Sequence, residues 1–202
     1  MPEEMSEDQK IPLKKKVLSY LSSAGIFLLE LIKVAVLAGI TIAFVRYFLF
    51  KPFYVKGASM EPNFFDKEYL IIDELSYRLR APERGEVIVF KYPENPKEFF
   101  LKRIIGLPGE RVKVAEGQIT IYNKEHPEGF MLKEKYLETT QVTAGNMRIK
   151  LDPNEYFVLG DNRLRSSDSR IWGNVNRSLI TGRVFFRALP LNEFGKVPKP
   201  NY

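Results

Sequence analysis

The chain lacks cysteine altogether and has a single histidine, His126, among its 202 residues. The absence of thiols excludes a disulfide framework, a cysteine nucleophile and any zinc site built on thiolates. His126 lies in the polar segment "NKEHPEG", which has the composition of a solvated loop. A Ser-His-Asp triad or a histidine metal site would depend on this one residue. The sequence therefore predicts neither, and we expect no metal and no cofactor.

The chain also lacks a basic stripe of the kind that binds nucleic acids. Its net charge is +6, but most Lys and Arg residues alternate with Asp and Glu. Part of the excess lies at Lys10, Lys14, Lys15 and Lys16, directly before an apolar stretch. Lysines in that position set the topology of a membrane segment. We therefore predict a lipid bilayer, and no nucleic acid, as a partner.

The apolar stretch at residues 25–50 is interrupted only by Glu30, Lys33 and Arg46. A helix of this length, at about 1.5 Å per residue, crosses a hydrocarbon core roughly 30 Å thick. Lys33 and Arg46 can extend toward the headgroups on the two sides. A buried core helix is the alternative interpretation. A cleaved signal peptide is disfavoured because "KPFYVKG" follows the stretch in place of a small-residue cleavage site.

Three regions follow from this interpretation. Residues 1–24 are predicted to be a basic tail in the cytoplasm, with residues 1–16 mobile, and residues 25–50 a single-pass transmembrane anchor. Residues 51–202 then lie on the extracytoplasmic side of the cell membrane. In this last region short β-like runs alternate with Gly, Pro, Asn and Asp, which predicts a mainly β domain. We expect strands near Phe53–Val55, Tyr69–Asp73, Glu86–Tyr92, Phe99–Gly106, Arg111–Val114, Gln118–Tyr122, Arg148–Lys150, Tyr156–Leu159 and Gly182–Ala188.

Two details of this β region are more specific. The segment "RVKVAEGQITIYN" is a hairpin candidate with Glu116-Gly117 at its turn. The polar, irregular stretch after it suggests a small insertion at about residues 115–150.

The first candidate for chemistry is Ser59 in "GASMEP". Small residues before a serine allow a sharp backbone turn and the close approach of a substrate. The same letters also describe an ordinary turn. A nucleophilic serine needs a group that accepts its proton, and the composition leaves no histidine for that role.

Lys102, in "FFLKRIIGLPGE", is the candidate base. If this segment is a strand, Phe100, Lys102 and Ile104 share one face, so the amine lies in an apolar row. Desolvation lowers the pKa of a lysine and allows it to accept a hydroxyl proton. The alternative is that Lys102 extends to solvent at a sheet edge, with Arg103 on the other face.

The third segment is "GDNRLRSSDSRIWG", residues 160–173. It is too polar for a core strand, yet it directly follows the apolar run "YFVL" and contains the sole tryptophan. We predict a structured loop in which a hydroxyl orients the amine of Lys102 and Asp161 or Asp168 pairs with Arg170. A solvated charged loop is the alternative.

In this order, and behind a membrane segment, "SMEP", "KRIIGLPGE" and "GDNRLRSSDSR" resemble the sequence boxes of the type I signal peptidase family. The resemblance implies a membrane-anchored serine endopeptidase that removes signal peptides from exported preproteins. It implies an antiparallel β-sheet catalytic domain with a small inserted β region, preceded by one N-terminal transmembrane helix. Ser59 is then the nucleophile and Lys102 the general base. The implied supporting residues are Ser166, hydrogen-bonded to the lysine, and Asp168, Arg170, Asp161 and Asn162.

Substrate binding is predicted from residues near the serine. Phe53 and Val55 share a face at period two and, with Met60 and Leu101, could line shallow apolar pockets. Such pockets accept small side chains, similar to the Ala-x-Ala preference of the family. We expect the substrate to bind extended, along an edge strand. Exposed aromatic residues, Phe53, Tyr54, Phe64 and Phe65, are candidates for contact with the bilayer surface, and core packing is the alternative for them.

One departure concerns Gly57, two residues before the serine, where some family members carry a serine that stabilises the oxyanion. Here the Ser59 backbone N–H and a neighbouring group or water must serve. Two further functions remain open. One is a Ser/Lys protease with another substrate, as in self-cleaving repressors, although no DNA-binding head is visible. The other is a non-catalytic, membrane-tethered β domain that binds partners. The sequence does not indicate the oligomeric state.

Overall fold

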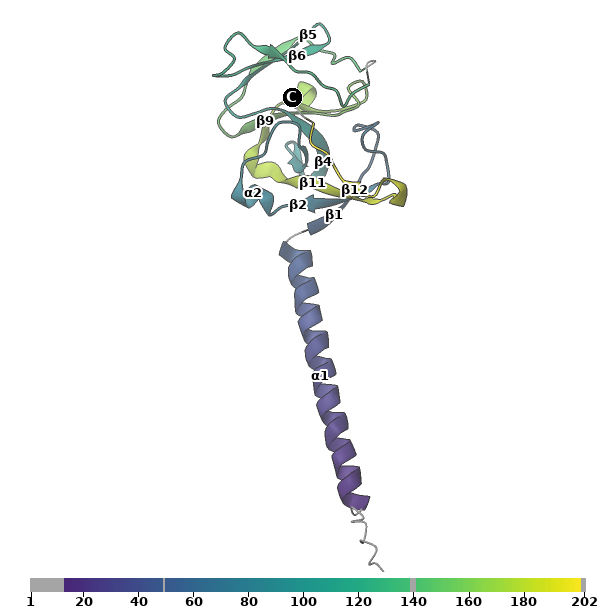
Figure 1. Cartoon of the computed structure of the whole chain (residues 1–202). Helices are drawn as coiled ribbons and strands as arrows, with labels where there is room; N and C mark the ends of the chain where they lie inside the picture. Colours follow the sequence, from purple (N-terminus) through teal and green to yellow (C-terminus); the bar gives the residue numbers. More distant parts are fainter. Residues whose placement is uncertain (1–12, 49, 139–140, 201–202) are drawn as a thin grey trace, which may run out of the picture. The chain divides into compact units, whose positions relative to one another are not determined.

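The computed structural model describes residues 13–48, 50–138 and 141–200. The chain divides into two compact units, residues 1–46 and residues 47–202 (Figure 1). Residues 1–12 of the predicted basic tail and residues 139–140 of the predicted insertion lie outside the described residues.

The described part of the first unit is one long helix, α1 (Leu13–Phe48), which ends two residues into the second unit. Its segment Ser23–Ala43 is long and apolar enough to cross a membrane: 21 residues, or about 32 Å at 1.5 Å per residue. The two charges within this segment neutralise each other, because Lys33 Nζ lies 2.9 Å from Glu30 Oε1. The helix begins inside the predicted tail and ends two residues before the predicted end of the anchor. It is therefore longer than the apolar stretch that revealed it.

The second unit consists of two antiparallel sheets. The larger has the order β1-β2-β11-β3-β4-β9-β10, with β12 paired to β11. Its strands are β1 (Phe50–Tyr54), β2 (Tyr69–Asp73), β3 (Val87–Tyr92), β4 (Asn95–Gly106), β9 (Glu155–Leu159), β10 (Val175–Asn176), β11 (Ile180–Leu189) and β12 (Gly195–Lys196). The short helices are α2 (Ser76–Leu79) and α3 (Ser169–Trp172), with 3-10 turns η1 (Arg177–Leu179) and η2 (Leu191–Glu193).

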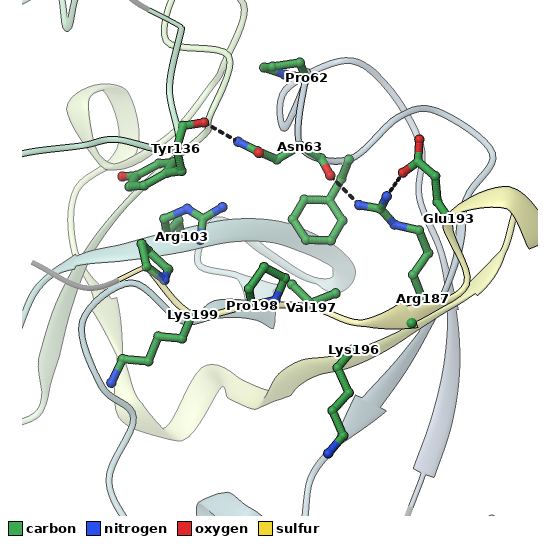
Figure 2. Close-up of a pocket in the computed structure, with 13 residues that line it drawn as sticks. Pro62, Asn63, Arg103, Tyr136, Arg187, Glu193, Lys196, Val197, Pro198 and Lys199 are labelled. Atoms are coloured by element: carbon green, nitrogen blue, oxygen red, sulfur yellow. Dashed lines mark hydrogen bonds and ion pairs between the residues drawn. The ribbon is translucent and has the colours of Figure 1, made fainter.

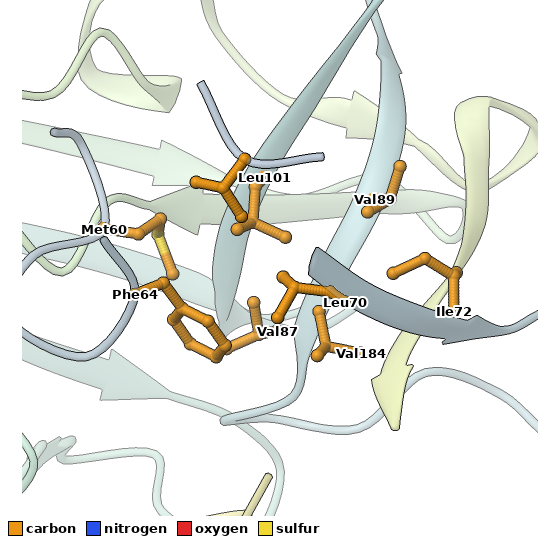
Figure 3. Close-up of a cluster of buried hydrophobic side chains, with 9 residues drawn as sticks. Met60, Phe64, Leu70, Ile72, Val87, Val89, Leu101 and Val184 are labelled. Atoms are coloured by element: carbon orange, nitrogen blue, oxygen red, sulfur yellow. The ribbon is translucent and has the colours of Figure 1, made fainter. Parts of the chain in front are cut away.

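The strands form because apolar side chains recur at the period of a pleated sheet, and the core lies where those faces meet. Figure 3 shows the cluster that supports the segment containing Ser59. Met60 and Phe64 from that segment pack there with Leu101 of β4 and with residues of β2, β3 and β11. The burial of Phe64, which is 1% exposed, makes it a core residue and excludes it from contact with a bilayer surface. Tyr54 and Phe65 are exposed.

The smaller sheet spans residues 111–150, a range that overlaps the predicted insertion and begins four residues before it. Its order is β7-β6-β5-β8, with strands β5 (Arg111–Ala115), β6 (Gln118–Tyr122), β7 (Phe130–Met131) and β8 (Met147–Lys150). The predicted hairpin is confirmed: β5 pairs with β6, and both residues of the Glu116-Gly117 turn have positive φ. One face of the sheet carries buried valines and isoleucines that pack on β9 residues. The expected mainly antiparallel β fold behind an apolar N-terminal helix is therefore confirmed.

The strand bounds differ from the prediction mainly at the ends. The first strand is Phe50–Tyr54, so Val55 follows it, and β4 starts four residues before its predicted start. Three two-residue strands, β7, β10 and β12, were not predicted. They are too short to show a period, and only their pairing with β6, β9 and β11 defines them.

Candidate active site

Ser59 and Lys102 lie in contact, although 43 positions separate them in the sequence. Ser59 lies in the turn that follows β1, and Lys102 is the eighth residue of β4. The distance from Lys102 Nζ to Ser59 Oγ is 2.8 Å, and Nζ also donates to the Leu101 carbonyl oxygen at 3.0 Å. The amine also lies 5.4 Å from the ring centroid of Phe100, on the same face of the strand. A hydroxyl and an amine at this distance are arranged for proton transfer.

The environment of Lys102 favours the neutral amine. The residue is 4% exposed, and burial lowers its pKa from 10.5 to about 8. Desolvation is the dominant cause, because it disfavours the ammonium form. The carboxylates of Asp168 and Asp161 act in the opposite direction and raise the pKa. The predicted alternative, a lysine that extends to solvent, does not agree with this burial.

Asp161 is held in a buried ion pair with Arg103, the residue that follows Lys102. Arg103 Nε lies 2.8 Å from Asp161 Oδ1, and both side chains are almost fully buried. The Arg103 guanidinium also stacks over the ring of Tyr136, 4.1 Å from its centroid, and Asn63 Nδ2 donates to Asp161 at 3.0 Å. Strand alternation places Arg103 on the face opposite Lys102. This pair fixes the start of the loop at residues 160–173 to β4.

Asp168 and Arg170 form the second ion pair of the loop. Arg170 Nε lies 2.8 Å from Asp168 Oδ1, and a terminal nitrogen of Arg170 lies 2.8 Å from Asp168 Oδ2. Asp168 also caps α3 and accepts a hydrogen bond from the Gly160 N–H at 3.1 Å. The loop thus closes on itself, because Gly160 begins it and Asp168 and Arg170 lie near its end. Of the two aspartates considered for Arg170, Asp168 is its partner.

Asn162 joins this loop to the segment that contains the serine. Its backbone N–H donates to the Ser59 carbonyl oxygen at 3.1 Å, and its side-chain amide donates to the Ala58 carbonyl oxygen at 3.0 Å. Two consecutive carbonyl groups of the serine segment are therefore held by one residue. This contact limits how far Ser59 can move relative to the loop.

Ser166 is buried, but it does not make the predicted hydrogen bond to Lys102 in this structure. In the described part of the chain, Ser166 Oγ has no hydrogen-bond partner. It packs closely against Gly160: a Cβ added to Gly160 would overlap both Ser166 Oγ and the Ser59 carbonyl oxygen. Position 160 therefore requires glycine, because the serine segment and the Ser166 side chain both approach its backbone.

The four predicted substrate-binding residues lie in one cleft with Ser59 and Lys102. The cleft has a volume of about 700 Å³. Its walls are the end of β1 with the segment after it, the middle of β4, and the loop at residues 160–173. Val55, Met60 and Leu101 are buried and form its apolar floor, and Phe53 packs against them. The full lining is Phe53, Tyr54, Val55, Lys56, Gly57, Ala58, Ser59, Met60, Glu98, Phe99, Phe100, Leu101, Lys102, Arg165 and Ser167.

Gly57 does not offer its N–H to this cleft. It has φ +87°, and its N–H donates to Asp66 Oδ1 at 2.8 Å. Among the described residues, the Ser59 N–H has no acceptor. Of these two N–H groups, only that of Ser59 is free to bind an oxyanion.

A second cavity of about 380 Å³ lies on the Arg103 side of β4 (Figure 2). Asn63, Tyr136, Arg187 and Glu193 line it with residues 195–200 of the C-terminal segment. Figure 2 shows the Arg187 side chain directed toward Glu193 and the Asn63 carbonyl oxygen. Neither Ser59 nor Lys102 lines this cavity, so it is separate from the cleft.

Sequence reasoning missed three residues of the site. They are Arg103, as the partner of Asp161, Asn63, which supports the same carboxylate, and Arg165, which lines the cleft. The strand period did place Arg103 opposite Lys102, but only the alternative interpretation, with both side chains extended to solvent, described its surroundings. No local pattern shows that Asp161, 58 positions later, reaches it.

Comparison with known proteins identifies the family of the chain. The sequence profile of the family described as signal peptidase, peptidase S26, matches residues 28–189. A probable signal peptidase I from Synechocystis sp. is 40% identical over 172 residues, which are 83% of this chain and 76% of that protein. A signal peptidase I from Leptolyngbya laminosa is 36% identical over 87% of both chains. A crystal structure of a signal peptidase I from Enterococcus faecalis is 30% identical, with a TM-score of 0.44, and covers 52% of this chain and 97% of that one.

The profile match covers most of the chain and includes Ser59, Lys102 and the loop at residues 160–173. The family consists of signal peptidases, and the curated relatives match across most of their own length. These findings show that the chain has signal peptidase I activity. It is a serine endopeptidase that cleaves signal peptides from secreted preproteins. The chain belongs to the signal peptidase I family, peptidase S26.

Proposed function

We propose that this signal peptidase cleaves preproteins with Ser59 as nucleophile and Lys102 as general base. The observation that carries the proposal is the 2.8 Å distance between Ser59 Oγ and the amine of a lysine that is 4% exposed. No histidine is required. Asp161, Asn162, Asp168 and Arg170 hold the loop against the serine segment, as their hydrogen bonds support. Ser166 packs beside them.

The neutral amine accepts the Ser59 hydroxyl proton while Oγ attacks the scissile carbonyl carbon. The resulting ammonium then gives this proton to the leaving amine, and an acyl-enzyme remains. A water molecule, deprotonated by the same amine, releases the acyl group and restores the serine. The Ser59 N–H is one donor to the oxyanion, and the Gly57 N–H is not, because Asp66 engages it.

The lowered pKa of Lys102 supplies a useful fraction of the base form. Below the pKa, the neutral fraction falls tenfold per pH unit. A lysine of pKa 10.5 is about 0.03% neutral at pH 7, whereas one of pKa about 8 is about 9% neutral. Burial thus raises the population of the active base about 300-fold at pH 7.

The apolar lining of the cleft suits a substrate with small side chains next to the cleaved bond. Phe53, Val55, Met60 and Leu101 form an apolar floor, and residues such as alanine next to the cleaved bond would pack on it. An extended substrate would lie between the end of β1, an edge strand, and the middle of β4. Backbone pairing along β1 would hold the chain in register.

We further propose that α1 is a single-pass anchor in the lipid bilayer, with its N-terminus in the cytoplasm and residues 51–202 outside. The lysines before the apolar segment support this orientation. Because the chain has no cysteine, single cysteines report the topology directly. Lys97→Cys should react with a membrane-impermeant maleimide in intact cells, and Lys10→Cys should react only after lysis. Labelling of Lys10→Cys in intact cells would overturn the orientation.

The catalytic proposal is tested with the full chain in detergent and a preprotein that has a small-x-small cleavage site. Ser59→Ala and Lys102→Met should each lower kcat by a factor of 1,000 or more, because each removes one half of the proton-transfer pair. Lys91→Ala, an exposed lysine on the neighbouring strand β3, is the matched control and should retain full activity. Cleavage that persists in Lys102→Met would assign the base to another group.

A further inference from the structure

The solvent face of the small sheet carries four cations in two facing rows. Arg111 and Lys113 lie on β5, and Arg148 and Lys150 lie on β8. In the antiparallel register Arg111 is opposite Lys150, and Lys113 is opposite Arg148. Each cation therefore has a like charge directly across the strand pair. We call these four residues the cationic face.

Nothing among the described residues neutralises the cationic face. No carboxylate of the described part lies within ion-pair distance of the four side chains, and the Arg111 guanidinium lies over the ring of Tyr122, 5.2 Å from its centroid. Like charges directly opposite one another destabilise a sheet. A shallow depression of about 280 Å³ lies over the face, lined by the four cations and Tyr122.

The cationic face reaches an open edge of the sheet. In the order β7-β6-β5-β8, β8 is the last strand. An extended polypeptide added beside β8 would place residues i and i+2 opposite Arg148 and Lys150. Acidic residues at those two positions would form cross-strand ion pairs. Charges at an edge also prevent aggregation, but that purpose does not explain Arg111 and Lys113, because β5 is an inner strand.

We propose that the cationic face is a second binding site, for an extended acidic segment of the preprotein substrate. The activity acts on polypeptide substrates, and an extended acidic segment of such a chain matches the cationic face in charge and in strand spacing. A surface of anionic lipid headgroups is the other occupant that the charge would fit, and the test below distinguishes the two. The site binds the substrate and takes no part in the chemistry.

The test uses the full chain in detergent and three preproteins that differ only after the cleavage site. One carries a Glu-x-Glu-x-Glu segment, one Ser-x-Ser-x-Ser and one Lys-x-Lys-x-Lys. The wild-type chain should show a KM about 3- to 10-fold lower for the glutamate substrate than for the serine substrate, with equal kcat, because exposed ion pairs contribute modestly. Salt at about 0.5 M should remove the difference.

The variant Arg148→Glu/Lys150→Glu should lose this preference and favour the lysine substrate. Its unchanged cleavage of the serine substrate will show that it is folded and that the dyad is intact. The matched control is Lys124→Glu/Lys133→Glu, which makes the same charge change at two exposed positions of the same region and should keep the preference.

Three results would overturn the proposal. The first is that the wild-type chain has equal KM values for the glutamate and serine substrates. The second is that the control variant loses the preference as much as Arg148→Glu/Lys150→Glu does. The third is that Arg148→Glu/Lys150→Glu keeps its KM values and loses only its binding to vesicles of anionic phospholipid. The last result would assign the cationic face to lipid headgroups. None of these outcomes depends on which residue is the base, so they are distinct from a failure of the catalytic proposal.

Discussion

Replacing Lys102 by methionine should make the catalytic unit more stable at neutral pH while it abolishes cleavage. Methionine has a similar length and no charge, so it fills the same apolar space without a buried ammonium. The lysine is kept at a cost to stability, because its folded-state pKa, about 8, is below its ordinary value of 10.5.

The sign and size of the effect follow from proton linkage. Below pH 8 both states bind the proton, and folding then includes the full cost of burying the ammonium. Between pH 8 and 10.5 the unfolded state binds more protons than the folded state, so stability rises with pH. Each pH unit in this window is equivalent to about 1.4 kcal/mol, which gives about 3 kcal/mol in total. Lys102→Met should therefore raise the free energy of unfolding by about 1–3 kcal/mol at pH 7.

Urea unfolding of the full chain in detergent measures this difference. Trp172, the sole tryptophan, reports on the core because its ring lies 5.8 Å from that of Phe90. Stability of the wild-type chain should rise from pH 8 to pH 10 more steeply than that of Lys102→Met, and Lys91→Met should behave as wild type. If Lys102→Met is less stable than wild type at pH 7, or keeps the same pH slope, the reasoning about a desolvated amine is refuted.

Three further substitutions test the support of the site and the cationic face. Gly160→Ala should lower kcat about 10- to 100-fold, because the added methyl group overlaps Ser166 Oγ and displaces the loop from the serine; steady-state cleavage measures this. Arg103→Met leaves the buried Asp161 carboxylate without its ion-pair partner, and urea unfolding should show a loss of about 3–5 kcal/mol. Lys113→Thr removes the like charge opposite Arg148, and the same assay should show a gain of about 0.2–1 kcal/mol.

Each substitution has a control and a contrary outcome. Gly195→Ala adds a methyl group in open space and should leave kcat unchanged; equal kcat for Gly160→Ala would show that the loop tolerates displacement. The control Arg78→Met removes an exposed arginine and should change the free energy of unfolding little. If Arg103→Met loses no more stability than this control, the buried pair is not required. A loss of stability in Lys113→Thr, with no change in Lys124→Thr, would mean that the lysine stabilises the sheet by its packing.

Local patterns predicted the parts of the fold whose period is visible. The apolar helix, the strand at Tyr69–Asp73 and the hairpin around Glu116-Gly117 follow from residue order alone. The contact between Ser59 and Lys102 could be anticipated because the composition leaves few other bases and because Lys102 lies in an apolar row.

Contacts between distant segments could not be predicted in the same way. The partner of Arg103 depends on the pairing of β4 with β9, which brings Asp161 to its side. Phe64 and Phe65 are adjacent in sequence, yet the first is buried and the second exposed, because the turn after Ser59 directs only one of them into the core. Tertiary packing decides which of these side chains is buried, so the sequence of a short segment does not predict it.

In the strand order of the large sheet, β11 lies between the hairpin β1-β2, whose connection contains the serine, and the hairpin β3-β4, which contains the lysine. These four strands all end before Leu107, whereas β11 is Ile180–Leu189, so a late segment of the sequence completes the sheet beneath an early pair of residues. Damage to β11 should therefore loosen the pairing of nucleophile and base from a distance, without altering either residue.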